Sequence, residues 1–339
     1  MSTEISPCPP TQSKAGVFTD PDAAVSPARV AVLIPCYNEA GAIATVVKDF
    51  AAALPHAKIY VYDNNSTDET RLLARQAGAI VRSEPLQGKG NVIRRMFADI
   101  EADVYVLVDG DGTYDASSAT RMVELLLSES LDMVNAERVA TSDSAYRRGH
   151  VLGNKLLTGA VALIFGDRIR DMLSGYRAFS RRFVKSFPAL ASGFETETEL
   201  TVHALELRLP IAEIRTPYRE RPAGSQSKLR TFRDGLRILR TILLLVKEER
   251  PLQFFSTVAA ILALSSVTLG WPLITTYLET GLVPRLPTAV LVTGLMVLAF
   301  MSFVAGLILD TVTLGRRELK RLQYLSLQGP VFRERRRTP

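Results

Sequence analysis

The chain has 339 residues, of which 47% are hydrophobic and 22% charged, and its formal net charge at pH 7 is +6. This length suffices for a complete α/β domain with a further element, and the positive charge favours an anionic partner: nucleic acid, lipid or a phosphorylated substrate. The two cysteines, Cys8 and Cys36, have no CxxC neighbour, and the three histidines lack metal-ligand spacing. Composition therefore argues against a disulfide framework and against a zinc site.

Residues 1–28 are rich in Pro, Ser and Ala and lack the apolar segment of a signal peptide, so we predict a disordered leader. From residue 29 onward, apolar runs typical of strands alternate with segments of helical periodicity. Strands are expected within 29–39, 58–65, 79–84 and 103–111, and helices within 41–54, 66–78 and 88–100. This alternation predicts a doubly wound, mostly parallel α/β sheet.

Polar residues gather where three of these strands end. They are residues 35–39, 63–65 and 109–111. In doubly wound sheets, ligands bind at the carboxyl ends of the strands. A helix cap would explain one acidic strand end, but three on the same edge predict a shared ligand site.

The third of these strand ends is the most acidic. Asp109 and Asp111 are separated only by Gly110, and their like charges repel unless a cation lies between them. Carboxylate oxygens suit Mg²⁺ or Mn²⁺, which would bridge phosphates and neutralise a leaving group. Gly110 and Gly112 are expected to let the loop turn tightly and a bulky ligand approach. Asp115 is expected to cap the next helix.

A second loop points to anions. QGKG, residues 87–90, is expected to be flexible, with Lys89 at the start of a helix, a position suited to negatively charged groups. The Walker A spacing is missing, and no GxGxxG follows the first strand. Both observations argue against P-loop and dinucleotide sites.

Residues 252–278 and 286–309 contain no charged residue, and each stretch is long enough to span a bilayer. The alternative is a pair of buried core helices. A seven-residue loop, ETGLVPR, would join the two spans into a hairpin. Cations flank the hairpin on both outer sides, and the positive-inside rule then places both termini in the cytoplasm. The cations are Lys247, Arg250, Arg316, Arg317, Lys320, Arg321, Arg333, Arg335, Arg336 and Arg337.

The segment 228–250 has a leucine-rich stripe with Arg230, Arg233, Arg237 and Arg240 elsewhere around it, as in a helix at a lipid headgroup interface; a surface helix packed on its own domain is the alternative. The expected organisation is a leader (1–28), a catalytic domain (29–227), a basic amphipathic juxtamembrane helix (228–250), a transmembrane hairpin (251–314) and a basic cytoplasmic tail (315–339). We expect an integral protein of the plasma or inner membrane, or an equivalent one, with a cytoplasmic catalytic domain.

Six motifs carry a family resemblance that covers residues 29–245. Four of them stand in the order and spacing of the GT-A fold, family 2 glycosyltransferases: IPCYNEAGAI, VYDNNSTDET, GKGNVIRRMF and VLVDGDGTYD. DMLSGYRAFSRR (171–182) and RPAGSQSKLRTFRDGL (221–236) resemble the later motifs of the polyprenyl-phosphate branch, which includes the dolichol-phosphate mannose synthases. The resemblance implies a GT-A-type sheet followed by the two-helix hairpin.

The resemblance also implies roles for individual residues. Asp109 and Asp111 would hold Mg²⁺ or Mn²⁺, with Asp111 the main ligand, and would act in catalysis together with Arg221. The nucleotide would be bound by Pro35, Tyr37, Glu39, Asp63, Lys89, Asp109 and Gly110. Arg221, Ser227 and Lys228 would close over the diphosphate, and Arg138 and Arg148 would clamp the acceptor phosphate. The chain departs from the mannose synthases at Thr113, where they have a glutamine, so a hydroxyl or water would replace that ligand.

The acceptor is suggested by the absence of an obvious general base. A sugar hydroxyl needs a base to remove its proton, whereas a lipid monophosphate, with a second pKa of about 6, does not. GFETETELTV (193–202) offers Glu195, Glu197 and Glu199 but singles out none, and a solvated or capping helix start is an equally good explanation.

We therefore expect a membrane-anchored inverting glycosyltransferase that moves a sugar from a UDP- or GDP-sugar to polyprenyl phosphate at the cytoplasmic face. Membrane lipids are expected partners, and self-association through the hairpin stays open. One alternative is a processive polysaccharide synthase, although the QxxRW motif of those enzymes is missing: Trp271, the only tryptophan, lies inside a predicted span. Another is a non-catalytic nucleotide-binding scaffold. Nucleic-acid binding is not expected, because the cations sit mainly at the membrane flanks and in the tail.

Overall fold

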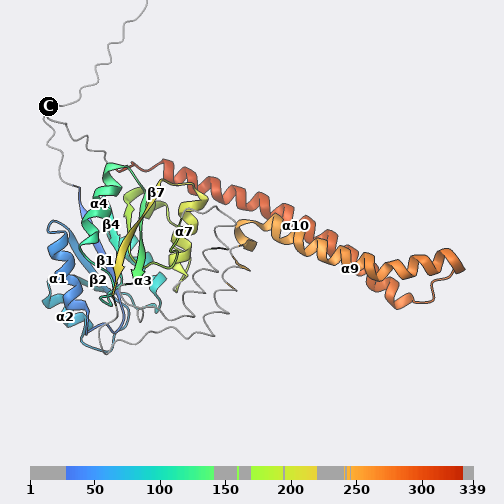
Figure 1. Cartoon of the computed structure of the whole chain (residues 1–339), viewed down its shortest axis with the longest axis horizontal. Helices are drawn as coiled ribbons and strands as arrows, with labels where there is room; N and C mark the ends of the chain where they lie inside the picture. The colour runs from blue at the N-terminus through green and yellow to red at the C-terminus, as the bar shows by residue number, and fades with distance from the viewer. Residues whose placement is uncertain are drawn as a thin grey trace, which may run out of the picture.

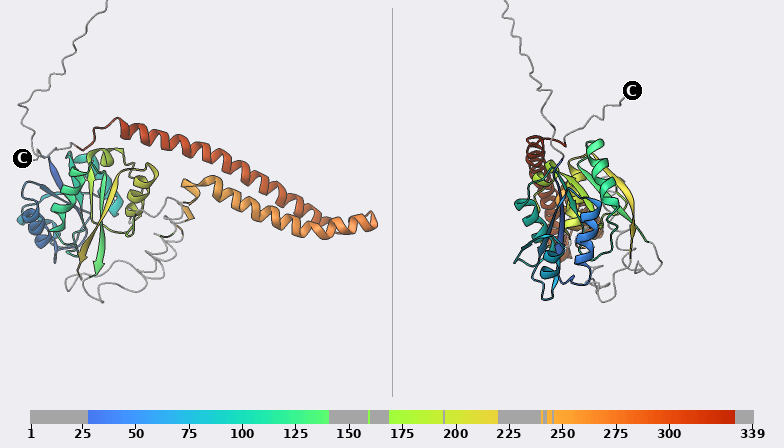
Figure 2. Two further views of the ribbon diagram at one scale, coloured as in Figure 1. Left: turned by 45° about the horizontal axis from the view of Figure 1, so that its top comes forward. Right: turned by 90° about the vertical axis from the view of Figure 1, so that its left-hand side faces the viewer.

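The computed structural model describes residues 28–140, 169–193, 195–219 and 246–330, together with Gly159, Arg240, Leu243 and Leu244. It shows an α/β domain from which two long helices extend side by side (Figures 1 and 2). The predicted Arg148, Arg221, Ser227 and Lys228 lie outside the described residues, as do the leader and most of the juxtamembrane segment.

The seven-stranded sheet has the order β3-β2-β1-β4-β6-β5-β7. Its strands are β1 (Val30–Cys36), β2 (Lys58–Asp63), β3 (Ile80–Ser83), β4 (Val104–Leu107), β5 (Met133–Ala140), β6 (Arg177–Ser180) and β7 (Ile211–Tyr218). Neighbours pair in parallel except β6, which runs antiparallel to both β4 and β5. The predicted mostly parallel α/β sheet is confirmed, with one reversed strand that periodicity did not indicate.

Alternation along the central strands builds a core on each face of the sheet. On β1, Ala31 and Leu33 face one core, while Val32 and Ile34 face the other, as a two-residue period requires. The first core is covered by α3 (Lys89–Asp99), α6 (Arg181–Ser186) and α7 (Thr196–Glu206). The second is covered by α1 (Ile43–Ala53), α2 (Thr70–Gln76) and α4 (Ser118–Ser128). Doubly wound sheets are covered in this way because their strands are buried on both sides.

The hairpin consists of α9 (Pro251–Thr280) and α10 (Leu286–Leu325). By length and composition both helices could cross a membrane, and little of either is buried within the described chain. α10 has 40 residues and continues well past the predicted span. The boundary expected at residue 315 falls inside this helix, and residues 315–325 are its last three turns.

The last turns of α10 are attached to the α/β domain. Arg317 and Lys320 pair with Glu206 of α7 at 3.2 and 2.7 Å. One turn further, the Tyr324 hydroxyl donates to Asp132. Positions 317, 320 and 324 are three and four residues apart, so they lie on one face of the helix. The hairpin and the domain are thereby joined by a continuous helix.

Candidate active site

The loops after β1 and β2 are fastened to each other at the carboxyl edge of the sheet. Cys36 lies opposite Asp63 in the parallel register, and the Asn64 amide donates to the Cys36 carbonyl at 2.9 Å. The Glu39 amide donates to the Thr70 hydroxyl at 2.8 Å. The four predicted nucleotide residues of these two strand ends, Pro35, Tyr37, Glu39 and Asp63, are therefore brought together at one edge.

Asp63 is almost fully buried, and only one of its two carboxylate oxygens accepts a hydrogen bond from the described residues. Oδ2 accepts from the Ser66 amide at 3.2 Å and lies 3.9 Å from Arg71. Oδ1 is buried with no hydrogen-bond partner among the described residues. A buried carboxylate oxygen without a donor is costly, so this atom is suited to accept from a ligand N–H or O–H.

The loop after β4 places its two aspartates differently. Asp111 is buried, and its Oδ1 accepts from the Thr113 hydroxyl at 2.7 Å and from the Thr113 amide at 3.2 Å. Asp109 is more open, with 29% of its side chain exposed. Gly112 has a φ of +74°, which favours glycine. A Cβ at Gly110 would lie 2.6 Å from Cys36 Sγ, so packing inside the protein by itself requires a glycine there.

Asp109 is held from two sides. Lys89 Nζ lies 2.5 Å from Asp109 Oδ1, and a Cβ on Gly175 would lie 2.3 Å from Asp109 Oδ2. Lys89 also pairs with Glu197 Oε1 at 2.5 Å, and only 8% of the Lys89 side chain is exposed. Burial lowers the pKa of Lys89, but the charges of Asp109 and Glu197 outweigh it and raise that pKa above its ordinary value. Lys89 is therefore a permanent cation shared by two carboxylates.

The QGKG segment is closely packed rather than flexible. Gly88 has a φ of +133°, and a Cβ there would lie 2.2 Å from the Ser192 carbonyl oxygen. A Cβ on Gly90 would lie equally close, at 2.2 Å, to the Ala191 carbonyl oxygen. The two glycines thus allow the start of α3 to contact residues 191–192, and the lysine between them already has two carboxylate partners.

The structure gives different surroundings to Glu197 and Glu199, which the sequence could not distinguish as candidate site residues. Glu199 accepts from the backbone amides of Leu190 and Ala191 at 2.8 and 2.9 Å, which is a structural role. Glu197 is buried against Lys89, and no described residue donates to its Oε2. The sequence did not single out Glu197, and helical spacing could not have done so, because Glu199 likewise stands three and four residues before buried Val202 and His203.

A second buried cation stands near Glu197. Arg177 on β6 is fully buried and donates to the carbonyls of Ser174 and Met172 and to the Thr201 hydroxyl. Burial lowers its pKa to about 10, against the opposing charge of Glu197. It lies in the motif DMLSGYRAFSRR, but no role had been assigned to it from the sequence.

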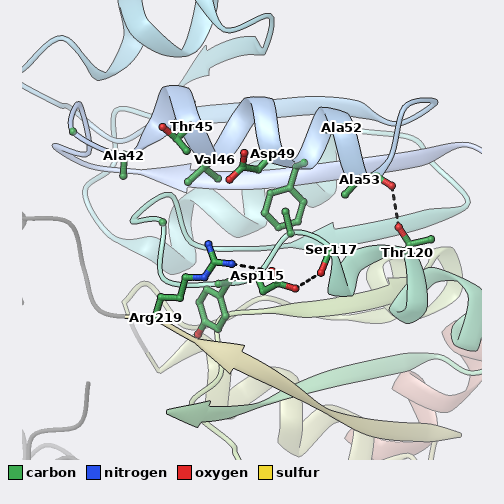
Figure 3. A pocket seen from close by; sticks show the side chains of 15 residues that line it. Ala42, Thr45, Val46, Asp49, Ala52, Ala53, Asp115, Ser117, Thr120 and Arg219 are labelled. Atoms are coloured by element: carbon green, nitrogen blue, oxygen red, sulfur yellow. Dashed lines mark hydrogen bonds and ion pairs between the residues drawn. The ribbon is translucent and has the colours of Figure 1, made fainter. Parts of the chain in front are cut away.

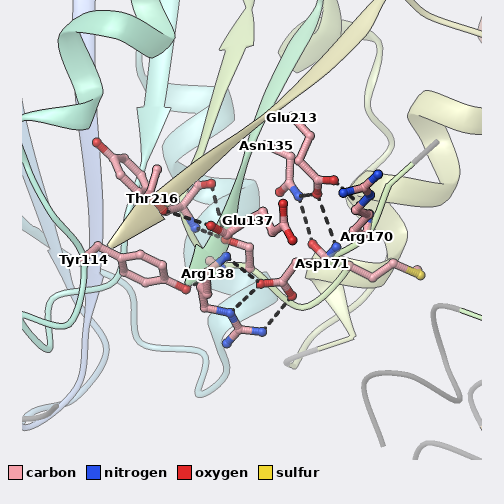
Figure 4. A network of polar contacts seen from close by, with 12 residues as sticks. Tyr114, Asn135, Glu137, Arg138, Arg170, Asp171, Glu213 and Thr216 are labelled. Atoms are coloured by element: carbon pink, nitrogen blue, oxygen red, sulfur yellow. Dashed lines mark hydrogen bonds and ion pairs between the residues drawn. The ribbon is translucent and has the colours of Figure 1, made fainter. Parts of the chain in front are cut away.

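Arg138, predicted to clamp the acceptor phosphate, has a carboxylate partner. Its Nε and Nη2 donate to the two oxygens of Asp171 at 2.7 and 2.8 Å, and its guanidinium lies 5.5 Å from the centre of the Tyr218 ring. The network extends to Asn135, which donates to Glu213 at 2.7 Å (Figure 4). A phosphate contacting Arg138 would have to share it with Asp171.

The end of β7 is fastened to the aspartate loop. The Arg219 amide donates to the Thr113 carbonyl at 2.8 Å, and Tyr114 bridges to Tyr218. The chain therefore leaves β7 beside Asp111.

A cavity lies next to the aspartate loop, between α1 and residues 112–120 (Figure 3). Its lining includes Asp49 and Phe50 from α1, with Asp115 and Arg219 opposite them. Asp115 accepts from the Ser118 amide at 3.2 Å, at the start of α4, in agreement with its expected capping role. Neither Asp109 nor Asp111 lines this cavity, so it is distinct from the aspartate pair.

The aspartate pair offers hard oxygen ligands for a divalent cation. Asp111 is oriented by Thr113 and Asp109 is partly open, which fits a Mg²⁺ or Mn²⁺ ion. No group of three or more His, Cys, Asp or Glu within the described ranges could hold a metal alone. The described side chains therefore suit an ion whose remaining ligands come from elsewhere, such as phosphates or water.

Comparison with known proteins finds similar glycosyltransferases. The family model described as Glycosyl transferase family 2 matches residues 31–187. Glycosyltransferase AglJ of Haloferax volcanii is 34% identical over 88% of this chain and 99% of its own length. The dolichyl-phosphate hexose transferase of the same organism is 27% identical over 65% of this chain and 95% of its own length.

Among solved structures, the chain is similar to glucosyl-3-phosphoglycerate synthase from Mycobacterium tuberculosis, in complex with Mn²⁺, UDP-glucose and phosphoglyceric acid. The TM-score is 0.52 at 24% identity, over 64% of this chain and 79% of that one. Similarity at this level establishes a shared fold.

Proposed function

Because this chain belongs to glycosyltransferase family 2, we propose that it transfers a sugar from a nucleotide diphosphate sugar to a polyprenyl phosphate at the cytoplasmic face of a membrane. The observation that carries the acceptor assignment is α10, a single helix that runs from an apolar, membrane-length segment onto the surface of the catalytic domain. Such a helix would keep the active site next to the bilayer, where a lipid phosphate is the available acceptor.

The donor assignment depends on the carboxyl edge of the sheet. Asp63 Oδ1 would accept from the nucleotide base or ribose, and Pro35, Tyr37 and Glu39 would line the same pocket. The similar synthase from M. tuberculosis was crystallised with UDP-glucose and Mn²⁺, which supports a UDP-sugar and a divalent metal here. Asp109 and Asp111 would hold the metal, and Arg221, two residues after Arg219 in the sequence, would close over the diphosphate with Ser227 and Lys228.

The relatives support a lipid phosphate acceptor, since they include dolichyl-phosphate transferases from H. volcanii and Saccharomyces cerevisiae. Arg138 and Arg148 would bind the acceptor phosphate, Arg138 while keeping its contact with Asp171. A phosphate oxygen would attack C1 of the sugar as the bond from C1 to the diphosphate oxygen breaks, which inverts the anomeric configuration. A bound metal would stabilise the negative charge of the leaving nucleoside diphosphate.

A donor screen on the full-length protein in detergent would test this proposal. UDP- and GDP-sugars are incubated with polyprenyl phosphate, with and without Mg²⁺ or Mn²⁺, and the glycolipid is quantified. We expect one donor to give metal-dependent product, and Asp111→Ala to abolish it. Failure of every donor with folded protein would overturn the proposal.

A further inference from the structure

The contact between Lys89 and Asp109 poses an electrostatic problem for the proposed metal site. An ammonium 2.5 Å from a carboxylate oxygen cancels most of the charge that the carboxylate offers to another cation. Asp109 and Asp111 alone would carry a charge of −2, but with Lys89 the sum falls to −1. The affinity of this loop for a dication would therefore be reduced by Lys89.

Glu197 counteracts this loss. Its Oε1 lies 2.5 Å from the same Lys89 nitrogen, so the ammonium is shared between two carboxylates. Only 7% of the Glu197 side chain is exposed, and solvent therefore screens this interaction poorly. The contact joins α7 to the start of α3 across 108 residues of sequence.

Arg177 makes the contribution of Glu197 larger. The described partners of the buried guanidinium are carbonyl and hydroxyl oxygens and the Met133 sulfur, none of which is charged. The negative charge of Glu197 therefore opposes the charge of Arg177, together with Asp171 and Glu213, as well as that of Lys89.

We infer that Glu197 is a positioning residue that acts through Lys89: by sharing the ammonium, it keeps Asp109 negative and correctly placed for a divalent cation. Glu197 touches neither the metal nor the nucleotide in this role. The inference depends on the proposed metal site at Asp109 and Asp111. Glu197 would raise the affinity of that site for a divalent cation.

Mn²⁺ affinity in a double-mutant cycle would test the inference. Free Mn²⁺ is measured by electron paramagnetic resonance in the presence of UDP, using full-length wild type, Glu197→Gln, Lys89→Gln and the double variant in detergent. Glu197→Gln should raise the Mn²⁺ dissociation constant about tenfold, in line with the loss of a group that orients a metal ligand. In the Lys89→Gln background, the same substitution should have an effect at least threefold smaller. Equal effects in both backgrounds would show that Glu197 acts by its own charge, and would overturn the inference.

Two further variants serve as controls. Glu199→Gln removes the same charge two positions along α7, from a residue bound to backbone amides, and should leave the Mn²⁺ dissociation constant within twofold of wild type. If Lys89→Gln does not fold, Glu197→Asp replaces it: the charge is kept but the shorter side chain withdraws from Lys89. Incomplete recovery of Mn²⁺ affinity would then support the inference, and full recovery would overturn it. Transfer activity of the wild type tests the proposed function separately, since an active wild type with an unaltered Glu197→Gln variant overturns only the role of Glu197.

Discussion

Tyr324, in the last turn of α10, donates its hydroxyl to Asp132 Oδ2 at 2.7 Å, although 192 residues separate the two in sequence. Asp132 is fully buried and also accepts from the Ser180 hydroxyl and from Arg182, whose guanidinium lies over the Tyr324 ring. This cluster fastens the end of the hairpin to the β6–α6 corner of the catalytic domain.

Tyr324→Phe should weaken this attachment. It removes one hydrogen bond to a buried carboxylate, so the free energy of unfolding should fall by about 1.5 kcal/mol. Asp132→Asn should cost more, about 3 kcal/mol, because Arg182 then loses its charge partner. Denaturant unfolding of the full-length protein in detergent measures both changes. Tyr277→Phe, at an exposed position on α9, is the matched control; an equal loss in that variant would contradict the attachment.

Gly175→Ala should reduce activity far more than stability. The added methyl group would lie 2.3 Å from Asp109 Oδ2, so the carboxylate must move. A displacement of about 1 Å at a catalytic group can cost on the order of 100-fold in rate, and we expect a loss of that size in transfer. In Gly41→Ala the methyl group meets nothing within 4 Å, and transfer should be unchanged. Wild-type activity in Gly175→Ala would show that Asp109 need not keep its place.

Thr113→Val should raise the metal concentration needed for activity. The valine keeps the shape of threonine but cannot donate to Asp111 Oδ1, so the proposed metal ligand loses its orientation. Loss of such a partner typically costs about 10- to 100-fold in metal affinity. Titration of transfer activity with Mn²⁺ measures the shift, and Thr113→Ser should restore most of the affinity. Indistinguishable titrations for valine and serine would refute the hydroxyl's role.

His203 should make the protein sensitive to mild acid. Burial, together with the nearby charge of Lys320, lowers the pKa of His203 to about 3, against 6.5 for the unperturbed side chain. Between these values the unfolded chain binds a proton that the folded chain does not, so stability should fall as the pH drops below about 6.5. The loss should reach on the order of 2 kcal/mol by about pH 4.5.

His203→Gln removes the titrating group, so the unfolding free energy should change less between pH 6.5 and 4.5 than in the wild type. Thermal unfolding at a series of pH values measures the slope. His56→Gln makes the same substitution at an exposed position and should leave the slope unchanged. If the slopes of the wild type and His203→Gln coincide, acid sensitivity arises elsewhere.

Features that depend on near neighbours along the chain could be predicted from the amino-acid sequence. Strand alternation such as Val32 and Ile34 against Ala31 and Leu33, the polar ends of β1, β2 and β4, and the two apolar helices all follow from short-range periodicity and composition. The family motifs then led to Asp63, Asp109 and Asp111, which the fold brings to the carboxyl edge of one sheet.

Contacts between groups far apart in the sequence could be identified only from the tertiary structure. In the folded chain β6 runs antiparallel to its neighbours, and Gly88 and Gly90 pack against residues 191–192. Glu197, rather than Glu195 or Glu199, is the partner of Lys89. The helix α10 also extends onto Asp132. These contacts join segments that lie far apart in the sequence. Local sequence propensity does not predict these contacts, because they depend on how the whole domain packs.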